Sequence, residues 1–252
     1  MIDPFPVALA SFHTPDGTRI AYRHLPGAGP LIVFLPGYMS DMTGTKAAAI
    51  MQHCAQRQRA CLLLDYSGCG SSEGDFADGT LSRWTGEVVS LLDRLDAGPV
   101  LLVGSSMGGW LMLLVALELV RRHGQQAVAG LVGIAPAPDF TRWGYDDAQK
   151  AQLAAGTTVY EHNAYGPEPT PTHAAFWQDG QRQQVLDKPI CVTAPVRLLH
   201  GQRDTDVPWQ KSLQLADALT SADVQIMLVK EGDHRLSRDA DIALLLGVID
   251  RM

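Results

Sequence analysis

One short segment of the chain could supply a nucleophile. Residues 104–109 read Gly-Ser-Ser-Met-Gly-Gly, directly after the apolar run 99–103 and directly before the apolar stretch 110–120. A Gly-x-Ser-x-Gly pattern between a strand and a helix is typical of the nucleophile elbow, a strained turn that exposes the serine hydroxyl above a sheet. The pattern alone occurs by chance in roughly one chain in ten of this length. Its apolar flanks are therefore what predict a nucleophile at Ser106.

A serine hydroxyl is a poor nucleophile unless a base accepts its proton and a carboxylate orients that base. We predict His234 as the base, because it follows the apolar run 224–229 in the segment Glu-Gly-Asp-His. We predict Asp204 as the orienting acid, because it follows the apolar run 196–200. The carboxyl ends of parallel strands meet at one edge of a sheet, so both side chains could converge on Ser106.

Two other carboxylates compete for the orienting role. Asp206 lies two residues beyond Asp204, and Asp139 follows the apolar run 128–135. Asp204 is favoured because the pattern Gly-x-x-Asp-x-x-Val-Pro at 201–208 puts it where a strand ends and lets Val-Pro begin the next turn. His200, which precedes this loop, is expected to be structural.

Negative charge on an attacked carbonyl oxygen needs backbone donors, and each is worth a few kcal/mol of barrier. We predict the N–H of Met107, at a helix N-terminus, as one donor. The N–H of Tyr38, in the segment Pro-Gly-Tyr-Met at 36–39, is the predicted second donor, and Gly37 would permit close backbone approach. A plain turn at 36–39 is the alternative.

The glycine-rich segment 65–74 also follows a strand-like run. Its spacing is G-x-G-x-x-x-G rather than the G-x-G-x-x-G of dinucleotide-binding loops, so we interpret it as a rigid loop bordering the active site. The sequence has no His-Glu-x-x-His, no Walker loop and no Cys/His spacing typical of zinc sites. We therefore predict neither a cofactor nor a metal.

Apolar runs of strand length recur along the chain, and helix-like segments separate them from the third run onward. This alternation predicts an α/β fold with a mostly parallel eight-stranded sheet and helices on both faces. The first two runs, joined by Thr-Pro-Asp-Gly at 14–17, predict an antiparallel hairpin at the sheet edge. The expected strands are 7–12, 19–22, 31–35, 60–65, 100–104, 128–135, 196–200 and 224–229, and the expected helices are 45–58, 81–95, 106–123, 209–219 and 239–251.

One interval breaks the alternation. About sixty residues separate the sixth and seventh runs, far more than an ordinary crossover needs. They carry aromatic residues amid prolines and glycines, so we predict a lid insertion at 139–189 within a single domain spanning 1–252. An extra helical pair at the rim of the sheet is the alternative.

Composition excludes several kinds of partner. The formal net charge is −7 and no run of Lys and Arg forms a basic stripe, which argues against nucleic acid. The most apolar helical segment, 110–120, is too short to cross a bilayer, so no stable membrane insertion is expected. The four cysteines lack C-x-x-C spacing, which predicts reduced and buried thiols. The sequence does not specify an oligomeric state.

The first residues, Met-Ile-Asp-Pro-Phe-Pro, carry neither the basic and apolar regions of a signal peptide nor the Arg-rich pattern of a transit peptide. On that basis we expect a cytoplasmic location.

With these residues identified, the chain resembles α/β-hydrolase-fold serine hydrolases. Segments 34–46, 65–72, 104–113, 197–201 and 233–235 are similar, within that superfamily, to mitochondrial abhydrolase-domain thioesterases that also act as acyl-glucuronide esterases. The similarity begins near residue 31 and extends to the C-terminus. It implies hydrolysis of S-palmitoyl thioesters or activated acyl esters, with Ser106, Asp204 and His234 at the matching positions of the triad.

These observations predict a serine hydrolase that cleaves esters or thioesters of medium or long acyl chains through an acyl-enzyme. Its partner would be a small ester or an S-acylated substrate. A C–C bond hydrolase or a perhydrolase would keep the same triad, and a ligand-binding module that lost catalysis is the non-enzymatic alternative. A dehalogenase is disfavoured, because that chemistry uses Asp where Ser106 stands.

Overall fold

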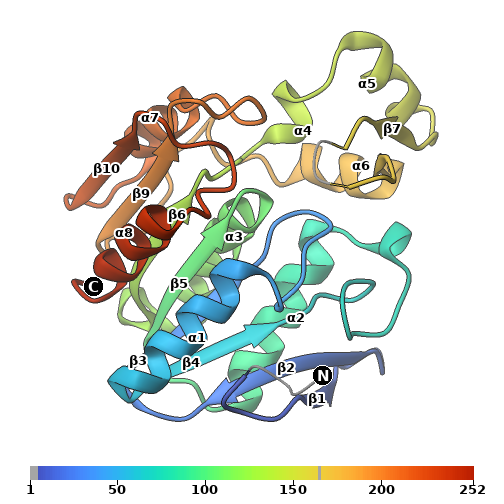
Figure 1. Cartoon of the computed structure of the whole chain (residues 1–252). Helices are drawn as coiled ribbons and strands as arrows, with labels where there is room; N and C mark the ends of the chain where they lie inside the picture. The colour runs from blue at the N-terminus through green and yellow to red at the C-terminus, as the bar shows by residue number, and fades with distance from the viewer. Residues whose placement is uncertain (1–4, 164–165) are drawn as a thin grey trace.

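An eight-stranded sheet forms the centre of the molecule (Figure 1). The structure is a computed structural model, and it describes residues 5–163 and 166–252. The strands lie in the order β1-β2-β4-β3-β5-β6-β9-β10; β1 and β2 pair antiparallel, as does β2 with β4, and the other pairs are parallel. Their bounds are β1 Ala10–His13, β2 Arg19–Leu25, β3 Ala28–Leu35, β4 Arg59–Leu64, β5 Val100–Ser105, β6 Val128–Ile134, β9 Val196–Gly201 and β10 Val224–Val229.

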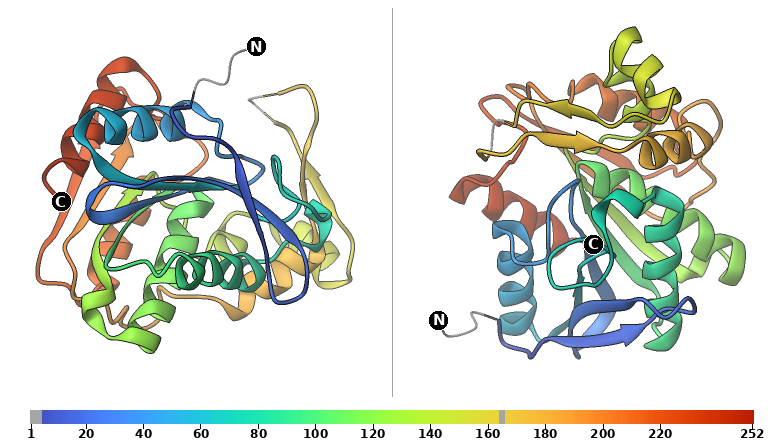
Figure 2. Two further views of the ribbon diagram at one scale, coloured as in Figure 1. Left: turned by 90° about the horizontal axis from the view of Figure 1, so that it is seen from below. Right: turned by 90° about the vertical axis from the view of Figure 1, so that its right-hand side faces the viewer.

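Helices cover both faces of this sheet (Figure 2). In β3, Val33 and Leu35 belong to the core on one face, whereas Ile32 and Phe34 belong to the core on the other. The first face is covered by α2 (Leu81–Arg94), α3 (Met107–His123) and α7 (Gln210–Ala218), and the second by α1 (Thr45–Arg57) and α8 (Asp239–Ile249). Because such strands are buried on both faces, they appear in the sequence as continuous apolar runs. The mostly parallel eight-stranded sheet with helices on both faces confirms the predicted fold class.

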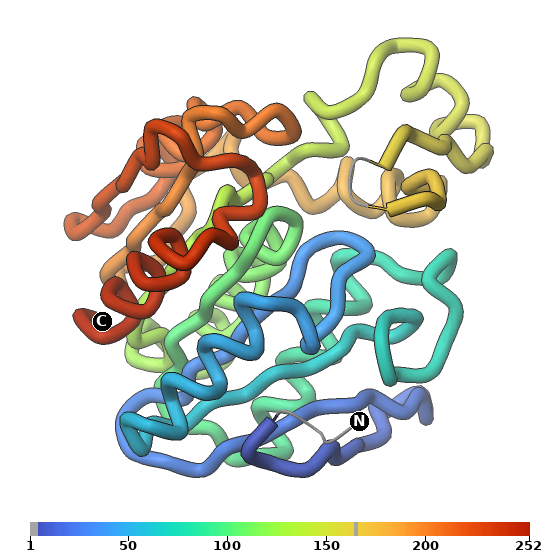
Figure 3. Tube along the Cα trace, in the orientation of Figure 1, coloured from blue at the N-terminus to red at the C-terminus, as the bar shows by residue number. Residues whose placement is uncertain are grey.

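The connection between β6 and β9 is a separate excursion above the carboxyl edge of the sheet (Figure 3). Its elements are α4 (Phe140–Trp143), α5 (Asp147–Ala154), β7 (Val159–Glu161), β8 (Thr170–Thr172) and α6 (Ala174–Arg182). We call residues 139–189 the insertion. The buried Asp139 carboxylate accepts backbone hydrogen bonds from Val185 and Leu186 at 2.9 Å each, so the two ends of the insertion are fastened together.

The insertion is also tied to the body of the molecule. Asp179, on α6, is almost fully buried and accepts hydrogen bonds from the backbone N–H and the hydroxyl of Ser82, both at 2.8 Å. Ser82 lies in the first turn of α2, so α6 is held against the helix that begins beside the glycine-rich loop.

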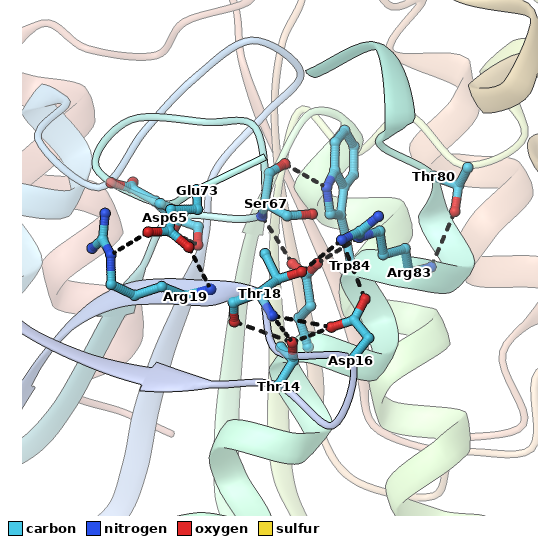
Figure 4. A network of polar contacts seen from close by, with 12 residues as sticks. Thr14, Asp16, Thr18, Arg19, Asp65, Ser67, Glu73, Thr80, Arg83 and Trp84 are labelled. Carbon is cyan, nitrogen blue, oxygen red and sulfur yellow. Dashed lines mark hydrogen bonds and ion pairs between the residues drawn. The ribbon is translucent and has the colours of Figure 1, made fainter. Parts of the chain in front are cut away.

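The glycine-rich loop 65–74 connects β4 to the short 3₁₀ helix η1 (Phe76–Asp78), and polar contacts fix it on two sides (Figure 4). The Trp84 indole N–H donates to the Ser67 carbonyl at 3.1 Å, and Arg19 pairs with Glu73. Inside the loop, the buried Asp65 carboxylate accepts from the backbone N–H of Met42 at 2.7 Å. Asp65 therefore couples this loop to the one that follows β3.

The remaining helical turn is η2 (Gln125–Ala127). Within the described part of the chain, none of the helices combines the length and the apolar character that crossing a membrane requires.

All four cysteines are free; Cys54, Cys61 and Cys69 are buried as predicted, but Cys191 is exposed. The prediction failed for Cys191 because it lies in an irregular segment just before β9 rather than in an element of the core.

Candidate active site

Ser106 lies at the turn between β5 and α3, with backbone angles of φ 55° and ψ −121°. A non-glycine residue with positive φ is strained, and the surroundings hold it there. A Cβ at Gly104 would lie 2.2 Å from the Gly108 carbonyl oxygen, and a Cβ at Gly108 would lie 2.1 Å from the carbonyl oxygen of Leu35. Glycine is therefore required on both sides of the serine, as the sequence pattern predicted.

His234, in the loop after β10, lies between Ser106 and Asp204. Its Nε2 is 3.0 Å from the Ser106 hydroxyl, and its Nδ1 is 2.8 Å from Oδ2 of Asp204, in the loop after β9. An ionised carboxylate only accepts hydrogen bonds, so Nδ1 carries the proton and Nε2 is left to accept from the hydroxyl. The structure thus brings the three predicted residues, from three separate loops, into one hydrogen-bonded chain.

The Asp204 carboxylate is completely buried and receives four hydrogen bonds. The backbone N–H groups of Asp206 and Val207 donate to Oδ1, while His200 and His234 face Oδ2. Burial by itself raises the pKa of this carboxyl, but the hydrogen bonds from the two histidines and Val207 outweigh it and hold the pKa well below its ordinary value.

The competing acids are placed elsewhere. Asp139 closes the base of the insertion, and Asp206 lines the cavity and donates its backbone N–H to Asp204. His200 is buried beside Asp204: its Nε2 lies 3.1 Å from Oδ2, and its Nδ1 lies 2.7 Å from the Ser212 hydroxyl. The expectation of a structural His200 is consistent with this geometry, but its contact with Asp204 was missed. The local sequence carries no signal for this contact, because residues 200–204 run from the end of β9 into a turn, where residues four apart do not regularly meet.

Tyr38 and Met107 both line the cavity that contains Ser106. The Gly37 backbone comes close to the serine, since a Cβ built there would lie 3.4 Å from the Ser106 Cβ. The Tyr38 ring packs against Phe76 and Phe176, with centroids 5.0 and 4.8 Å away, and this fixes the loop after β3. The role of the Tyr38 and Met107 amides as oxyanion donors stays a prediction.

The cavity has a volume of about 630 Å³. One wall comes from the insertion and carries Phe140, Trp143 and Tyr145. Another part of the lining is polar and includes Lys46, from the first turn of α1, and Arg235, next to His234. These two cations were not predicted, because nothing in their local sequence distinguishes them from solvated charges. In the described ranges, no three His, Cys, Asp or Glu side chains are grouped so as to hold a metal ion.

Comparison with known proteins agrees with the fold and the geometry. Residues 32–247 match the alpha/beta hydrolase family, and the chain belongs to that family. It is a serine hydrolase. Among its relatives, the mouse protein named palmitoyl-protein thioesterase ABHD10, mitochondrial, is 43% identical over 238 residues, which cover 92% of this chain and 78% of the relative.

Solved structures give the same result. A protein of Agrobacterium vitis S4 superimposes with a TM-score of 0.91 at 39% identity, covering 98% of both chains. Mouse alpha/beta hydrolase domain-containing protein 10 superimposes with a TM-score of 0.87, also at 39% identity, covering 97% of both chains. The resemblance inferred from the sequence motifs is confirmed.

The expectation of a cytoplasmic location is wrong in the light of these relatives, whose names place them in mitochondria. It rested on the composition of residues 1–6, of which 1–4 lie outside the described residues. A targeting signal is read and removed independently of the folded domain, so such composition is poor evidence for the compartment of a hydrolase.

Proposed function

We propose that the chain hydrolyses carboxylic esters and thioesters of medium or long acyl chains through an acyl-enzyme on Ser106. The observation that carries the proposal is the continuous relay from Ser106 through His234 to Asp204, opening into a cavity with an aromatic wall. The mouse relative is named a palmitoyl-protein thioesterase, which supports an acylated substrate.

In the proposed mechanism, His234 Nε2 accepts the Ser106 proton as Oγ bonds to the acyl carbonyl carbon. The carbonyl π electrons move to oxygen, and the amides of Met107 and Tyr38 stabilise this oxyanion. Asp204 keeps the proton on Nδ1 and stabilises the imidazolium. When the tetrahedral intermediate collapses, His234 returns the proton to the departing oxygen or sulfur. Water then repeats the sequence on the acyl-enzyme, which releases the acid and restores the serine.

The insertion at 139–189 acts in this proposal as a lid that covers the acyl group. Its aromatic side chains can bury methylene groups, each worth about 0.8 kcal/mol when removed from water. The same wall would accept an acyl glucuronide as readily as a thioester, because only the leaving group differs. A relay with both hydrogen bonds formed argues against a module that has lost catalysis.

The proposal is tested first by Ser106→Ala. This variant should retain the fold and lose both turnover and labelling by a fluorophosphonate probe, because no other hydroxyl adjoins His234 Nε2 in the described structure. Circular dichroism controls for folding. Undiminished labelling would place the nucleophile elsewhere.

A series of 4-nitrophenyl esters and matched acyl thioesters of increasing chain length tests the substrate class. We expect kcat/KM to rise by about 2–4-fold for each added methylene until the cavity is full. A steady decline from acetyl upward would contradict a long-acyl hydrolase but would leave the role of Ser106 intact. Strong cleavage of acyl glucuronides with little thioesterase activity would contradict the thioester part alone.

A further inference from the structure

A lysine amine is held in the wall of the catalytic cavity. Lys46 lies in the first turn of α1 and is partly buried. Its Nζ donates to the backbone carbonyl of Arg235 at 2.6 Å and lies 3.4 Å from the Ser237 hydroxyl. An ammonium group has three N–H donors, so these two contacts leave one for a further acceptor.

The charge of this amine has no paired carboxylate. Among residues 5–163 and 166–252, no Asp or Glu oxygen lies within 4.0 Å of Lys46 Nζ, whereas 17 other ion pairs are formed. Burial, together with the nearby Arg235 charge, lowers the pKa of Lys46 to about 8, against the more distant attraction of Asp233 and Asp241. A cation in such surroundings is stabilised by an anion that enters the cavity.

Three acids of the described structure line the cavity, Asp41, Glu161 and Asp206, and no ion pair joins any of them to Lys46. Asp41 accepts from the backbone N–H and the hydroxyl of Thr43, at 2.7 and 2.6 Å, within its own turn. Glu161 is on β7 in the insertion, where the Gln149 amide lies 3.3 Å away. The carboxylates of Asp41 and Glu161 are therefore engaged by groups other than Lys46.

The position of the amine indicates which part of a substrate it meets. Lys46 Nζ is hydrogen-bonded to the backbone carbonyl of Arg235, the residue that directly follows His234. In the proposed mechanism, His234 must deliver its proton to the leaving group. A group beside this loop lies on the leaving-group side of the reacting carbon, whereas Phe140, Trp143 and Tyr145 line the wall formed by the insertion. We propose that Lys46, with Arg235 in the same cavity, forms a subsite for a carboxylate or phosphate carried by the leaving group.

This inference rests on the proposed hydrolase function and makes Lys46 a specificity residue rather than a catalytic one. Its test compares two butyrate esters with the same acyl group, the 4-nitrophenyl ester and the anionic 3-carboxy-4-nitrophenyl ester. A second pair, a butyryl thioester of N-acetylcysteamine and butyryl-coenzyme A, replaces the carboxylate with phosphates. If the variants below affect the first pair, the subsite binds a carboxylate; if they affect the second pair, it binds a phosphate.

In at least one pair, Lys46→Met should lower kcat/KM for the anionic member about tenfold more than for the neutral member. The change should come mainly through KM, and its size is that expected for the loss of one charge-assisted hydrogen bond. Lys46→Arg should restore much of this ratio. Lys188→Met is the matched control, since Lys188 is exposed and does not line the cavity; it should leave the ratio unchanged. An equal loss for both members would mean that Lys46 only anchors the loop, and would overturn the proposal.

The wild-type enzyme supplies a readout that does not depend on a variant folding. Because burial lowers the pKa of Lys46 to about 8, KM for the anionic ester should rise as the pH increases from 7 to 9 relative to KM for the neutral ester. A constant ratio would contradict the subsite. A mono-4-nitrophenyl glutarate, anionic on the acyl side, should not show the effect; if it alone does, the subsite faces the acyl group and our placement is wrong. If no member of either pair is hydrolysed, even when an octanoyl group replaces the butyryl group, it is the proposed function that fails.

Discussion

At the scale of single residues, Asp204 is the most constrained side chain of the candidate site. Both of its oxygens are occupied, one by two backbone N–H groups and the other by two histidine rings. A carboxylate held by so many donors stays ionised and keeps one orientation. The neighbouring Asp206 donates its backbone N–H to Asp204, and it is the Asp204 carboxylate that contacts His234.

Asp204→Asn should therefore reduce kcat by about 10⁴-fold, the loss seen when the orienting aspartate of a serine protease triad becomes asparagine. The amide places a donor where Nδ1–H of His234 needs an acceptor, which favours the wrong tautomer. Steady-state kinetics on a 4-nitrophenyl ester measures the effect, with Asp206→Asn as the neighbouring control. If Asp206→Asn or Asp139→Asn is the crippled variant instead, Asp204 is not the orienting acid.

Residues of the site differ in how far the sequence alone could predict them. Ser106, Asp204 and His234 each follow an apolar run, so their convergence could be inferred from strand order. Two other hydrogen bonds join segments that no local pattern connects. The Asp65 carboxylate accepts from the Met42 N–H, and Lys46 Nζ donates to the Arg235 carbonyl. Such contacts depend on side-chain reach across the finished fold, and periodicity carries no information about it.

At the scale of elements, the close approach of β3 to the start of α3 holds the elbow together. Gly108→Ala would put a Cβ 2.1 Å from the Leu35 oxygen and 2.5 Å from the Pro36 oxygen. We expect a loss of stability on the order of 1–3 kcal/mol from this overpacking. We also expect a large loss of activity, because the loop that bears Tyr38 must shift.

Gly86→Ala provides the matched comparison, since Gly86 lies within α2 and a Cβ there meets nothing within 4 Å. Alanine is a better helix former, so this variant should gain about 0.5–1 kcal/mol. Urea denaturation measures both variants. Equal stability of the two would show that the crowding at Gly108 is relieved without cost.

The insertion depends on α6 remaining in place. Asp179→Asn should cost about 1–3 kcal/mol, because the amide nitrogen cannot accept from Ser82, whose N–H and hydroxyl each donate to one of the two carboxylate oxygens. We expect faster limited proteolysis within 139–189 and a higher KM for long-chain esters. Asp187→Asn removes an exposed pair with Arg142 in the same segment and should change neither. If long-chain KM is unaffected by Asp179→Asn, the insertion does not cover the acyl group.

Apart from the 3₁₀ helices η1 and η2, the elements that the sequence did not predict lie in this insertion. Strands β7 and β8 have three residues each, too few for alternation to be recognised, and β8 contains Pro171. All eight strands of the main sheet were predicted from their apolar residues, and the signal is strongest in the central strands β3, β4, β5, β6 and β9, which are buried on both faces. Strand β3 nevertheless starts three residues earlier than expected, at Ala28. Ala28 is exposed at the start of the strand and lacks the apolar signal.

At the scale of the whole molecule, packing determines the reactivity of the thiols. The thiolate is the reactive species, and burial raises the pKa of Cys69 to about 12. Cys54 and Cys61 are also buried, whereas Cys191 is exposed. A thiol titration of the native protein should therefore count about one fast-reacting group, and the denatured protein about four. Cys191→Ser should abolish the fast reaction; its persistence would mean that a buried cysteine becomes exposed by local opening.

The bond between His234 and Ser106 joins positions that are 128 residues apart, whereas the elbow closes within a few residues of itself. During synthesis, β5 and α3 leave the ribosome long before the segment that bears His234. A nascent chain thus carries its serine without a base, and contacts of such long range form late in folding. Incomplete chains consequently cannot attack the acyl compounds of the cell, and the appearance of esterase activity reports that the last strands have joined the sheet.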